Sequence, residues 1–349
     1  MTEISDNSTL MEPDRDASDE SKALRRKRLF RVVKWLTILV VLAAMGWQIS
    51  KLADDWGTDG AKVFERSLAW GWLAAAMVFF WAGQFCFSLY WRRLLLVSDV
   101  SAPLVPSVRA YLVGTLGKYM PGKALVVVVR TGMLPDAKGK RFLVGGVTIY
   151  ETLTSMSAAG LIGVIAMLVT RQDLIRNMLG AASIAIALSV IVHPTAFGRL
   201  AKMVAIPFRR KGDPLPVRDW YRCYWRSAPL LLCEWLGSGL SLWATAAAFH
   251  LDVMSFDAVL FLTGVAALAT AAGFLVLPVP AGIGVREFIV ISLLTKWFGE
   301  HATAVCISLV LRTLWTAGEI LLAGGLYLLP GVTWARAKMS ENGVSAASS

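Results

Sequence analysis

The stretch Pro278-Val279-Pro280-Ala281-Gly282-Ile283-Gly284-Val285-Arg286-Glu287 decides how the chain folds, because it interrupts a long series of apolar residues. Pro278 and Pro280 have no amide hydrogen to donate, which breaks the hydrogen bonding of a helix. Gly282 and Gly284 permit backbone conformations that other residues resist. The stretch is therefore predicted to end one helix and to begin another.

The charged end of this stretch, Arg286 and Glu287, has two readings that the residues leave open. If the new helix begins at membrane depth, its free amides, its dipole and the guanidinium of Arg286 form a site for a phosphate or another anion. If it begins at the membrane surface, the two side chains are an ordinary ion pair in a loop. Non-helical backbone is tolerated at membrane depth only where it lines a cavity or is buried in protein.

The composition indicates a membrane protein. Of the 349 residues, 56% are hydrophobic and 17% are charged, and the mean hydropathy is +0.59, whereas soluble domains are about 45–50% apolar. The formal net charge is +11, and the basic residues cluster beside apolar segments, where they retain loops in the cytoplasm. No nucleic-acid motif accompanies them. The four cysteines show no CxxC spacing and the three histidines are far apart, so we expect no metal site and no cofactor.

The two ends of the chain differ from its middle. Residues 1–20 are acidic and lack apolar periodicity, and residues 1–28 are predicted to be a disordered cytoplasmic tail. A transmembrane domain is expected over residues 29–330, followed by a short polar tail over 331–349. The first span, Leu29–Ile49, follows a cluster of lysines and arginines, which predicts that the N-terminus is cytoplasmic.

Apolar segments of spanning length recur along the chain and predict an all-α, polytopic transmembrane helical bundle. We expect about seven or eight spans, because a short helix near 284–299 adds an eighth if it crosses the bilayer. The loop 194–227 carries eight basic residues against two acidic ones, which predicts that it is cytoplasmic. The seven longer spans are predicted at Leu29–Ile49, Leu68–Trp91, Phe142–Thr170, Met178–Val192, Ala228–Leu251, Ala258–Leu277 and Ala302–Pro330.

Residues 94–141 form a first irregular region, in which prolines and glycines separate apolar pieces too short to cross a bilayer. We predict a re-entrant or half-helix hairpin there. Its break at Pro121 and Gly122 occupies a place in the first half comparable to that of Pro278–Glu287 in the second. Paired interruptions of this kind point to a transporter's binding site near the middle of the membrane.

Ionisable residues inside spans are costly, and they mark either functional sites or structural ion pairs. An interhelical ion pair is the simpler interpretation for Glu234 and Glu319. Arg312 and Glu319 are seven residues apart and therefore share a helix face. Titration of Glu151 or Glu287 could also couple proton flow to transport. The residues that we expect to bind a substrate are Lys123, Arg130, Glu151, Arg286, Glu287 and Arg312.

Several ordered motifs give the chain a resemblance to a known family, the lysylphosphatidylglycerol synthase transmembrane-region proteins, also called flippase-like membrane proteins. These motifs are Trp91-Arg92-Arg93-Leu94-Leu95, Gly117–Lys123 followed by Arg130, Tyr150-Glu151, Pro278–Glu287, and Arg312 in the last span. Two positions depart from the family's pattern. Ala281 stands where a glycine is usual, and the glutamate often found between the glycine and the arginine of the first motif is absent.

The resemblance implies movement of phospholipids or isoprenoid-linked lipids across the bacterial inner membrane. It does not imply aminoacyl transfer, because the segment after the last span is short. We therefore expect a non-enzymatic translocase of an anionic phospholipid or isoprenoid-linked lipid. Its cations would hold the headgroup, while Glu151 and Glu287 orient those cations or titrate.

Two alternatives stay open. Asp54 and Asp55, in the first outer loop, are a pair of acids of the kind that membrane-embedded glycosyltransferases use, and a solvated pair of loop charges is the simpler interpretation. The chain could also be a non-catalytic accessory subunit of a lipid-modifying complex. The expected partners are a membrane lipid and a lipid-modifying enzyme or glycosyltransferase, and not nucleic acid.

Overall fold

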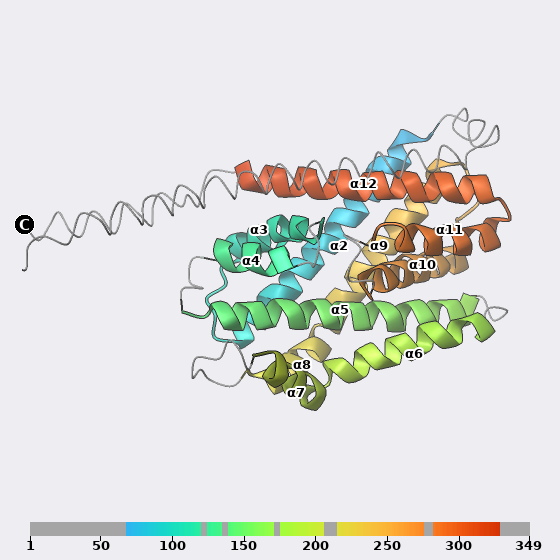
Figure 1. The fold of residues 1–349 in the computed structure, drawn as a ribbon. Coiled ribbons are helices and arrows are strands. Elements are labelled where there is room, and N and C mark those ends of the chain that lie inside the picture. Colours follow the sequence, from blue (N-terminus) through green and yellow to red (C-terminus); the bar gives the residue numbers. More distant parts are fainter. Residues whose placement is uncertain are drawn as a thin grey trace, which may run out of the picture. The chain divides into compact units, whose positions relative to one another are not determined.

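The computed structural model describes residues 68–119, 124–134, 139–170, 175–205, 215–275 and 282–328. Within these ranges the regular structure is entirely helical, which confirms the predicted all-α class (Figure 1). The elements, in chain order, are α2 (Trp70–Val97), α3 (Leu104–Thr115), the 3-10 helix η1 (Leu116–Tyr119), α4 (Ala124–Met133), α5 (Arg141–Thr170), α6 (Ile175–Val192), α7 (Pro194–Ala205), α8 (Val217–Arg226), α9 (Ala228–Ala248), α10 (Phe256–Leu275), α11 (Val285–Phe298) and α12 (His301–Leu328).

Five of the described helices, α2, α5, α9, α10 and α12, are long and apolar enough to cross a bilayer. The chain is therefore a multi-pass membrane protein. Two further helices lie where the sequence predicted helices. They are α6, which has 18 residues, and α11, which has 14. The predicted count of about seven or eight spans is consistent with this set. The first predicted span, Leu29–Ile49, lies outside the described residues, as do the tails at 1–28 and 331–349 and the acidic pair Asp54-Asp55.

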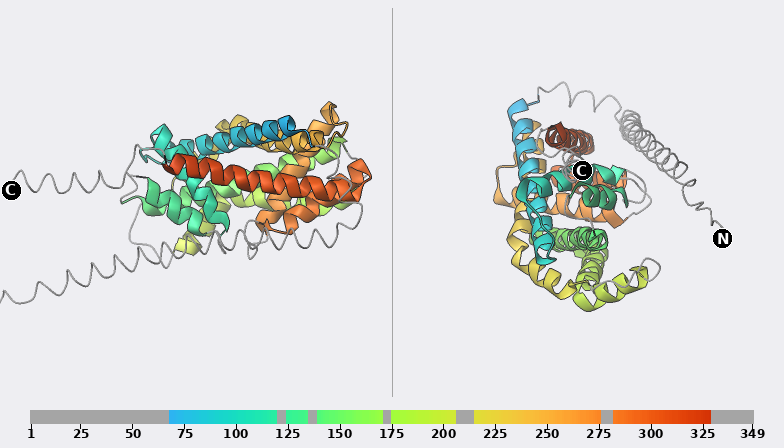
Figure 2. Two further views of the ribbon diagram at one scale, coloured as in Figure 1. Left: turned by 90° about the horizontal axis from the view of Figure 1, so that it is seen from above. Right: turned by 90° about the vertical axis from the view of Figure 1, so that its left-hand side faces the viewer.

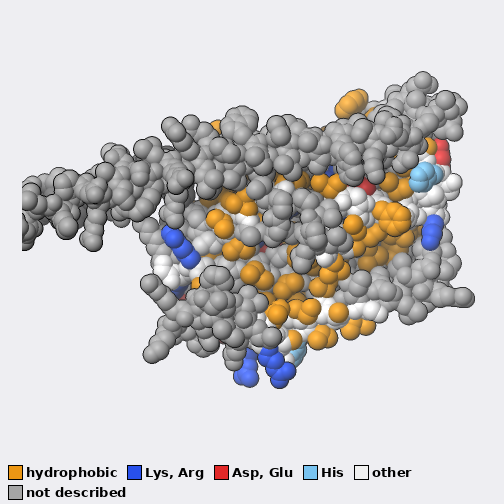
Figure 3. All heavy atoms as spheres, in the orientation of Figure 1, with side chains coloured by type: hydrophobic (Ala, Val, Ile, Leu, Met, Phe, Trp, Pro, Cys, Tyr) orange, Lys and Arg blue, Asp and Glu red, His pale blue; other side chains and the backbone are white. Residues whose placement is uncertain are grey.

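Large apolar side chains remain exposed on the outer faces of these helices. Val78 of α2 is 59% exposed, Ile165 of α5 is 58% exposed and Leu321 of α12 is 61% exposed. On the face drawn in Figure 3, orange hydrophobic side chains fill much of the visible middle, and blue Lys and Arg side chains lie toward the edges. Hydrocarbon chains accept such a surface and exclude charge from it, so these faces are suited to contact lipid.

Pairs of neighbouring helices build the bundle. The longest contact runs between α2 and α9, which are antiparallel because the Ala69 amide donates to the Ala248 carbonyl oxygen over 3.1 Å. α5 packs against α6 on one side and α10 on another, and α12 lies against α11, α3 and α2 (Figures 1 and 2). These contacts bring α3, from the first irregular region, against the last helix.

Glycines let the backbones of α2 and α9 touch. A Cβ added at Gly237 would lie 2.8 Å from the Phe79 carbonyl oxygen and 3.1 Å from the backbone nitrogen of Gly83. A Cβ added at Gly83 would lie 3.0 Å from the carbonyl oxygen of Glu234. Membrane helices associate through such small residues, because close van der Waals contact drives their packing where the hydrophobic effect between helices is missing.

We expect Gly237→Ala to destabilise the protein, because the atoms nearest to the added methyl group belong to backbone that cannot turn aside. Overpacking of this kind costs about 1–3 kcal/mol. Gly324→Ala in α12 is the matched control, since nothing lies within 4 Å of a Cβ there. Thermal unfolding in detergent, followed by size-exclusion chromatography, should give a lower midpoint for Gly237→Ala only. Equal midpoints would contradict the close contact of α2 with α9.

The first irregular region folds as the predicted half-helix hairpin. With 12 residues in α3, four in η1 and 10 in α4, none of these helices is long enough to cross a bilayer. α4 packs back against α3 and η1. The predicted break at Pro121 and Gly122, together with Lys123, falls outside the described residues.

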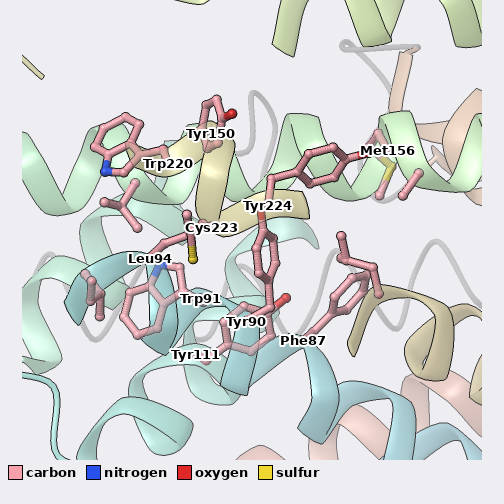
Figure 4. Close-up of a cluster of buried hydrophobic side chains, with 14 of the residues drawn as sticks. Phe87, Tyr90, Trp91, Leu94, Tyr111, Tyr150, Met156, Trp220, Cys223 and Tyr224 are labelled. Atoms are coloured by element: carbon pink, nitrogen blue, oxygen red, sulfur yellow. The ribbon is translucent and has the colours of Figure 1, made fainter. Parts of the chain in front are cut away.

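The segment 194–227, predicted as a loop, instead contains the helices α7 and α8. Val217, Trp220 and Tyr224 of α8 recur at helical spacing and are buried. Figure 4 shows Trp220 and Tyr224 in the aromatic cluster with Tyr150 of α5 and residues of α2. The Trp220 indole donates to the Ser98 hydroxyl over 2.7 Å. The many arginines obscured this amphipathic pattern in the sequence.

Candidate functional site

The break before α11 has the backbone that its glycines predicted. Gly282 has φ 68° and Gly284 has φ 88°, both in the region that favours glycine. Gly282 also packs on Gly273 of α10, since a Cβ at Gly282 would lie 2.7 Å from the Gly273 Cα. α11 then begins at Val285, and the Gly284 amide donates to Glu287 Oε2 over 2.6 Å. Pro278 and Pro280 lie outside the described residues.

Arg286 lies in the first turn of α11 and stacks on an aromatic ring of α12. Its guanidinium carbon is 4.1 Å from the centroid of the Trp315 ring, within the range of a cation–π contact. Among the residues that the structure describes, no carboxylate pairs with Arg286 and no acceptor takes a hydrogen bond from it. The five N–H donors of its planar guanidinium therefore have no acceptor within the described ranges.

Two of the other predicted residues meet beside Arg286. Arg312 of α12 places its Nε 3.5 Å from Oε1 of Glu287, and both side chains are buried. The charges of Arg312 and Glu287 both act on Arg286, so the three groups form one electrostatic cluster. The structure thus brings together Arg286, Glu287 and Arg312, which the sequence placed on two separate apolar segments.

The first irregular region reaches this cluster through η1. Lys118 forms an ion pair with Glu319 of α12, and the Tyr119 hydroxyl donates to Glu319 Oε2 over 3.0 Å. The charges of Arg286 and Arg312 also act on Lys118. The interhelical ion pair expected for Glu319 is therefore present. Within the described ranges the cluster holds three cations and two carboxylates, which leaves one positive charge in excess.

Lys118 and Tyr119 were missed as site residues by the sequence reasoning. The available signal was their position, since both directly precede the predicted break at Pro121 and Gly122. For their partner Glu319 the sequence predicted an interhelical ion pair but did not identify the cation. The pairing of a short 3-10 helix with α12 depends on tertiary packing, which the sequence pattern does not contain.

Arg130 of α4 and Glu151 of α5 form a separate buried pair. Arg130 Nη1 lies 2.8 Å from Glu151 Oε2, and the Tyr111 hydroxyl donates to Glu151 Oε1 over 3.1 Å. The guanidinium carbon of Arg130 is 3.7 Å from the centroid of the Tyr111 ring. Gly114 makes room for this side chain, because a Cβ there would overlap the Cγ of Arg130. Lys123, the other predicted cation of this region, lies outside the described residues.

Glu234 of α9 interacts with a member of each of these two groups of charges and departs from its prediction. Glu151 and Arg286 both act on it electrostatically. The ion pair expected for Glu234 is not found among the described residues, where Ser238 donates to Glu234 Oε1 over 3.3 Å. α2 presents Gly83, which has no side chain, against the backbone of Glu234, and no lysine or arginine of the described ranges lies within ion-pair distance of the carboxyl group.

The comparisons with known proteins bear on this arrangement. A family model described as Lysylphosphatidylglycerol synthase TM region matches residues 34–323. The matched range includes both broken segments and every ionisable site residue named above. The search of curated proteins found no match. In the part of the chain that the structure covers, no three His, Cys, Asp or Glu side chains gather as metal ligands would.

Proposed function

The chain belongs to the family of the lysylphosphatidylglycerol synthase transmembrane region, and from this membership we propose that it moves an anionic lipid between the two leaflets of its membrane. The family is a membrane domain associated with lipid-modifying and flippase-like proteins. The observation that carries the proposal is Arg286, a cation inside a membrane bundle that has no carboxylate partner among the described residues. A substrate anion would supply the missing partner.

Phosphate is the anion that this arrangement suits. A guanidinium offers parallel N–H donors that match two phosphate oxygens, and the Trp315 ring holds its plane in place. Arg312 adds a second positive charge, oriented by Glu287. Lys118 adds a third, oriented by Glu319. The phosphodiester of a phospholipid and the phosphate of an isoprenoid-linked lipid share this chemistry.

The residue types in the cluster support transport without a chemical step. The cluster presents cations and aromatic rings, which bind a phosphate, and its two carboxylates are both engaged with cations. The broken helix places this cluster at the start of α11, where free backbone amides also favour an anion. We propose that the protein lies in the bacterial inner membrane with its N-terminus in the cytoplasm. Its proposed partners are lipids and a lipid-modifying enzyme.

Reconstitution tests the proposal directly. We expect the purified protein in phosphatidylcholine vesicles to expose fluorescent phosphatidylglycerol from the inner leaflet to an external quencher faster than protein-free vesicles do. A fluorescent phosphatidylcholine, which has no net charge, should move more slowly. Equal quenching with and without protein would contradict the proposal. Transfer of a sugar from a polyprenyl donor in the same vesicles would favour the glycosyltransferase alternative instead.

A further inference from the structure

Glu234 is a buried carboxyl group that the proposed headgroup site does not use. Glu234 is only 1% exposed. Oε1 accepts a hydrogen bond from Ser238 over 3.3 Å, and Oε2 has no hydrogen-bond partner among the residues that the structure describes. No lysine or arginine of the described ranges lies within ion-pair distance of it. The other buried carboxylates of the bundle, Glu151, Glu287 and Glu319, each have a cation within that distance.

A carboxylate in this position is costly, because membrane interiors solvate an unpaired charge poorly. A proton removes that cost, since the neutral acid carries no net charge into the low dielectric. Buried carboxyl groups of this kind recur as proton-binding groups in pumps and transporters. Because no cation of the described ranges neutralises the Glu234 carboxylate, we infer that a proton does.

A line of polar groups connects Glu234 with the anion site. Glu234, Ser238 and Ser241 lie on one face of α9, at the spacing of successive helix turns, and all three are buried. The Trp315 indole donates to the Ser241 hydroxyl over 2.9 Å. The guanidinium of Arg286 stacks on the same indole ring. Glu234 and Arg286 are thus connected through α9 and α12, which pack against each other.

Titratable and charged groups on several neighbouring elements interact electrostatically with Glu234. Of these groups, Glu151 is held in an ion pair with Arg130. Arg286 acts on Glu234 and has no carboxylate of its own in the described ranges. The titratable and charged groups that interact with Glu234 are Cys86 on α2, Tyr111 on α3, Glu151 on α5 and Arg286 on α11.

We propose that Glu234 is a proton-binding site whose occupancy is coupled to the binding of an anionic headgroup at Arg286. This inference depends on the proposed function. An arriving phosphate cancels the positive potential that Arg286 exerts on Glu234, which removes what favours the carboxylate form. Glu234 then takes up a proton, and it releases the proton when the headgroup leaves. The carboxylate and the proton combine to the neutral acid, and no other group changes.

Linkage fixes the sign and the size of the effect. Because the lipid-bound state holds more protons than the free state, the lipid binds more tightly as the pH falls. One coupled proton sets the limit, so the dissociation constant changes by at most about tenfold per pH unit. The effect is confined to the pH range in which Glu234 gains or loses its proton.

Titration calorimetry counts this proton. Short-chain phosphatidylglycerol is the probe, because its phosphodiester keeps one negative charge throughout the neutral range. Binding to the whole protein in detergent is measured in two buffers of different ionisation enthalpy, whose difference in heat gives the protons taken up. We expect uptake by the wild type and by Glu300→Gln, an exposed control. Glu234→Gln should bind the lipid without proton uptake and with no pH dependence.

The outcomes separate the two proposals. Lipid binding by the wild type without proton uptake would overturn the coupling, and so would unchanged uptake in Glu234→Gln. A protein that binds no phosphatidylglycerol would instead defeat the headgroup site. In that case infrared difference spectra across a pH titration of the lipid-free protein decide for Glu234. A carboxylic acid band that is lost in Glu234→Gln supports the proton site, and its absence from the wild type overturns it.

Discussion

Arg286→Lys should lower the rate of anionic-lipid translocation by about ten- to a hundredfold, because it removes one charge-assisted hydrogen bond worth about 1.5–3 kcal/mol. Lysine keeps the positive charge but has no planar fork to bind two phosphate oxygens. It also loses the stacking of the guanidinium on Trp315. The fold should persist, since Arg286 holds no carboxylate in the described ranges that the change would strand.

The measurement is the initial rate of quenching of fluorescent phosphatidylglycerol in vesicles with equal amounts of folded protein. Arg222→Lys on α8 is the matched control, because Arg222 is 72% exposed and pairs with Asp219 over 3.4 Å at the surface. It should transport as the wild type does. A full rate for Arg286→Lys, or an equal loss in both variants, would show that Arg286 has no role in the transport step.

The sequence predicted the parts of this site that depend on local chemistry. Proline lacks the amide donor that a helix interior needs, and glycine permits the turn that follows, so clusters of the two predicted the start of α11 and the hairpin of α3 and α4. Hydropathy and length then placed the five spanning helices, because a bilayer leaves few alternatives for such segments. Arg286, Glu287 and Arg312 were selected for the cost of charge at membrane depth, and the structure places them side by side.

The sequence did not predict which charged side chains pair with one another. Lys118 and Glu319 are 201 residues apart, and only the packing of η1 on α12 makes them partners. Glu234 was expected to form an ion pair because buried carboxylates usually do, yet among the described residues its carboxyl group accepts a hydrogen bond from Ser238 and has no cation within ion-pair distance. The helix α8 was not predicted, because its arginines obscured the helical spacing of its apolar residues in the sequence. Pairing and register are properties of the tertiary fold.

Arg130 shows how this limit affects the functional interpretation. The sequence grouped it with Arg286 as a cation for the headgroup, and that role stays a prediction. The structure adds that Arg130 is 3% exposed and that its charge already faces Glu151 over 2.8 Å. Arg286 has no such partner among the described residues. The two arginines should therefore respond differently to substitution, one in transport rate and the other in the stability of the fold.

Arg130→Met should lower the free energy of unfolding by about 3–5 kcal/mol, because it leaves Glu151 as an unpaired charge in the bundle. The Tyr111 hydroxyl would remain as a donor to that carboxylate but cannot neutralise it. Adding Glu151→Gln removes the stranded charge. The double variant should therefore be more stable than Arg130→Met by itself, and the two changes should deviate from additivity by more than about 1 kcal/mol.

Denaturant unfolding in mixed micelles, followed by tryptophan fluorescence, measures these differences. Arg222→Met is the matched control, since its ion pair with Asp219 is solvent-exposed and such pairs contribute about 0–1 kcal/mol. If Arg130→Met were no more damaging than Arg222→Met, the pair with Glu151 would be hydrated in the folded protein. Arg130 would then be free to bind a headgroup as Arg286 is, and a loss of transport in Arg130→Lys at unchanged stability would place it in the same site.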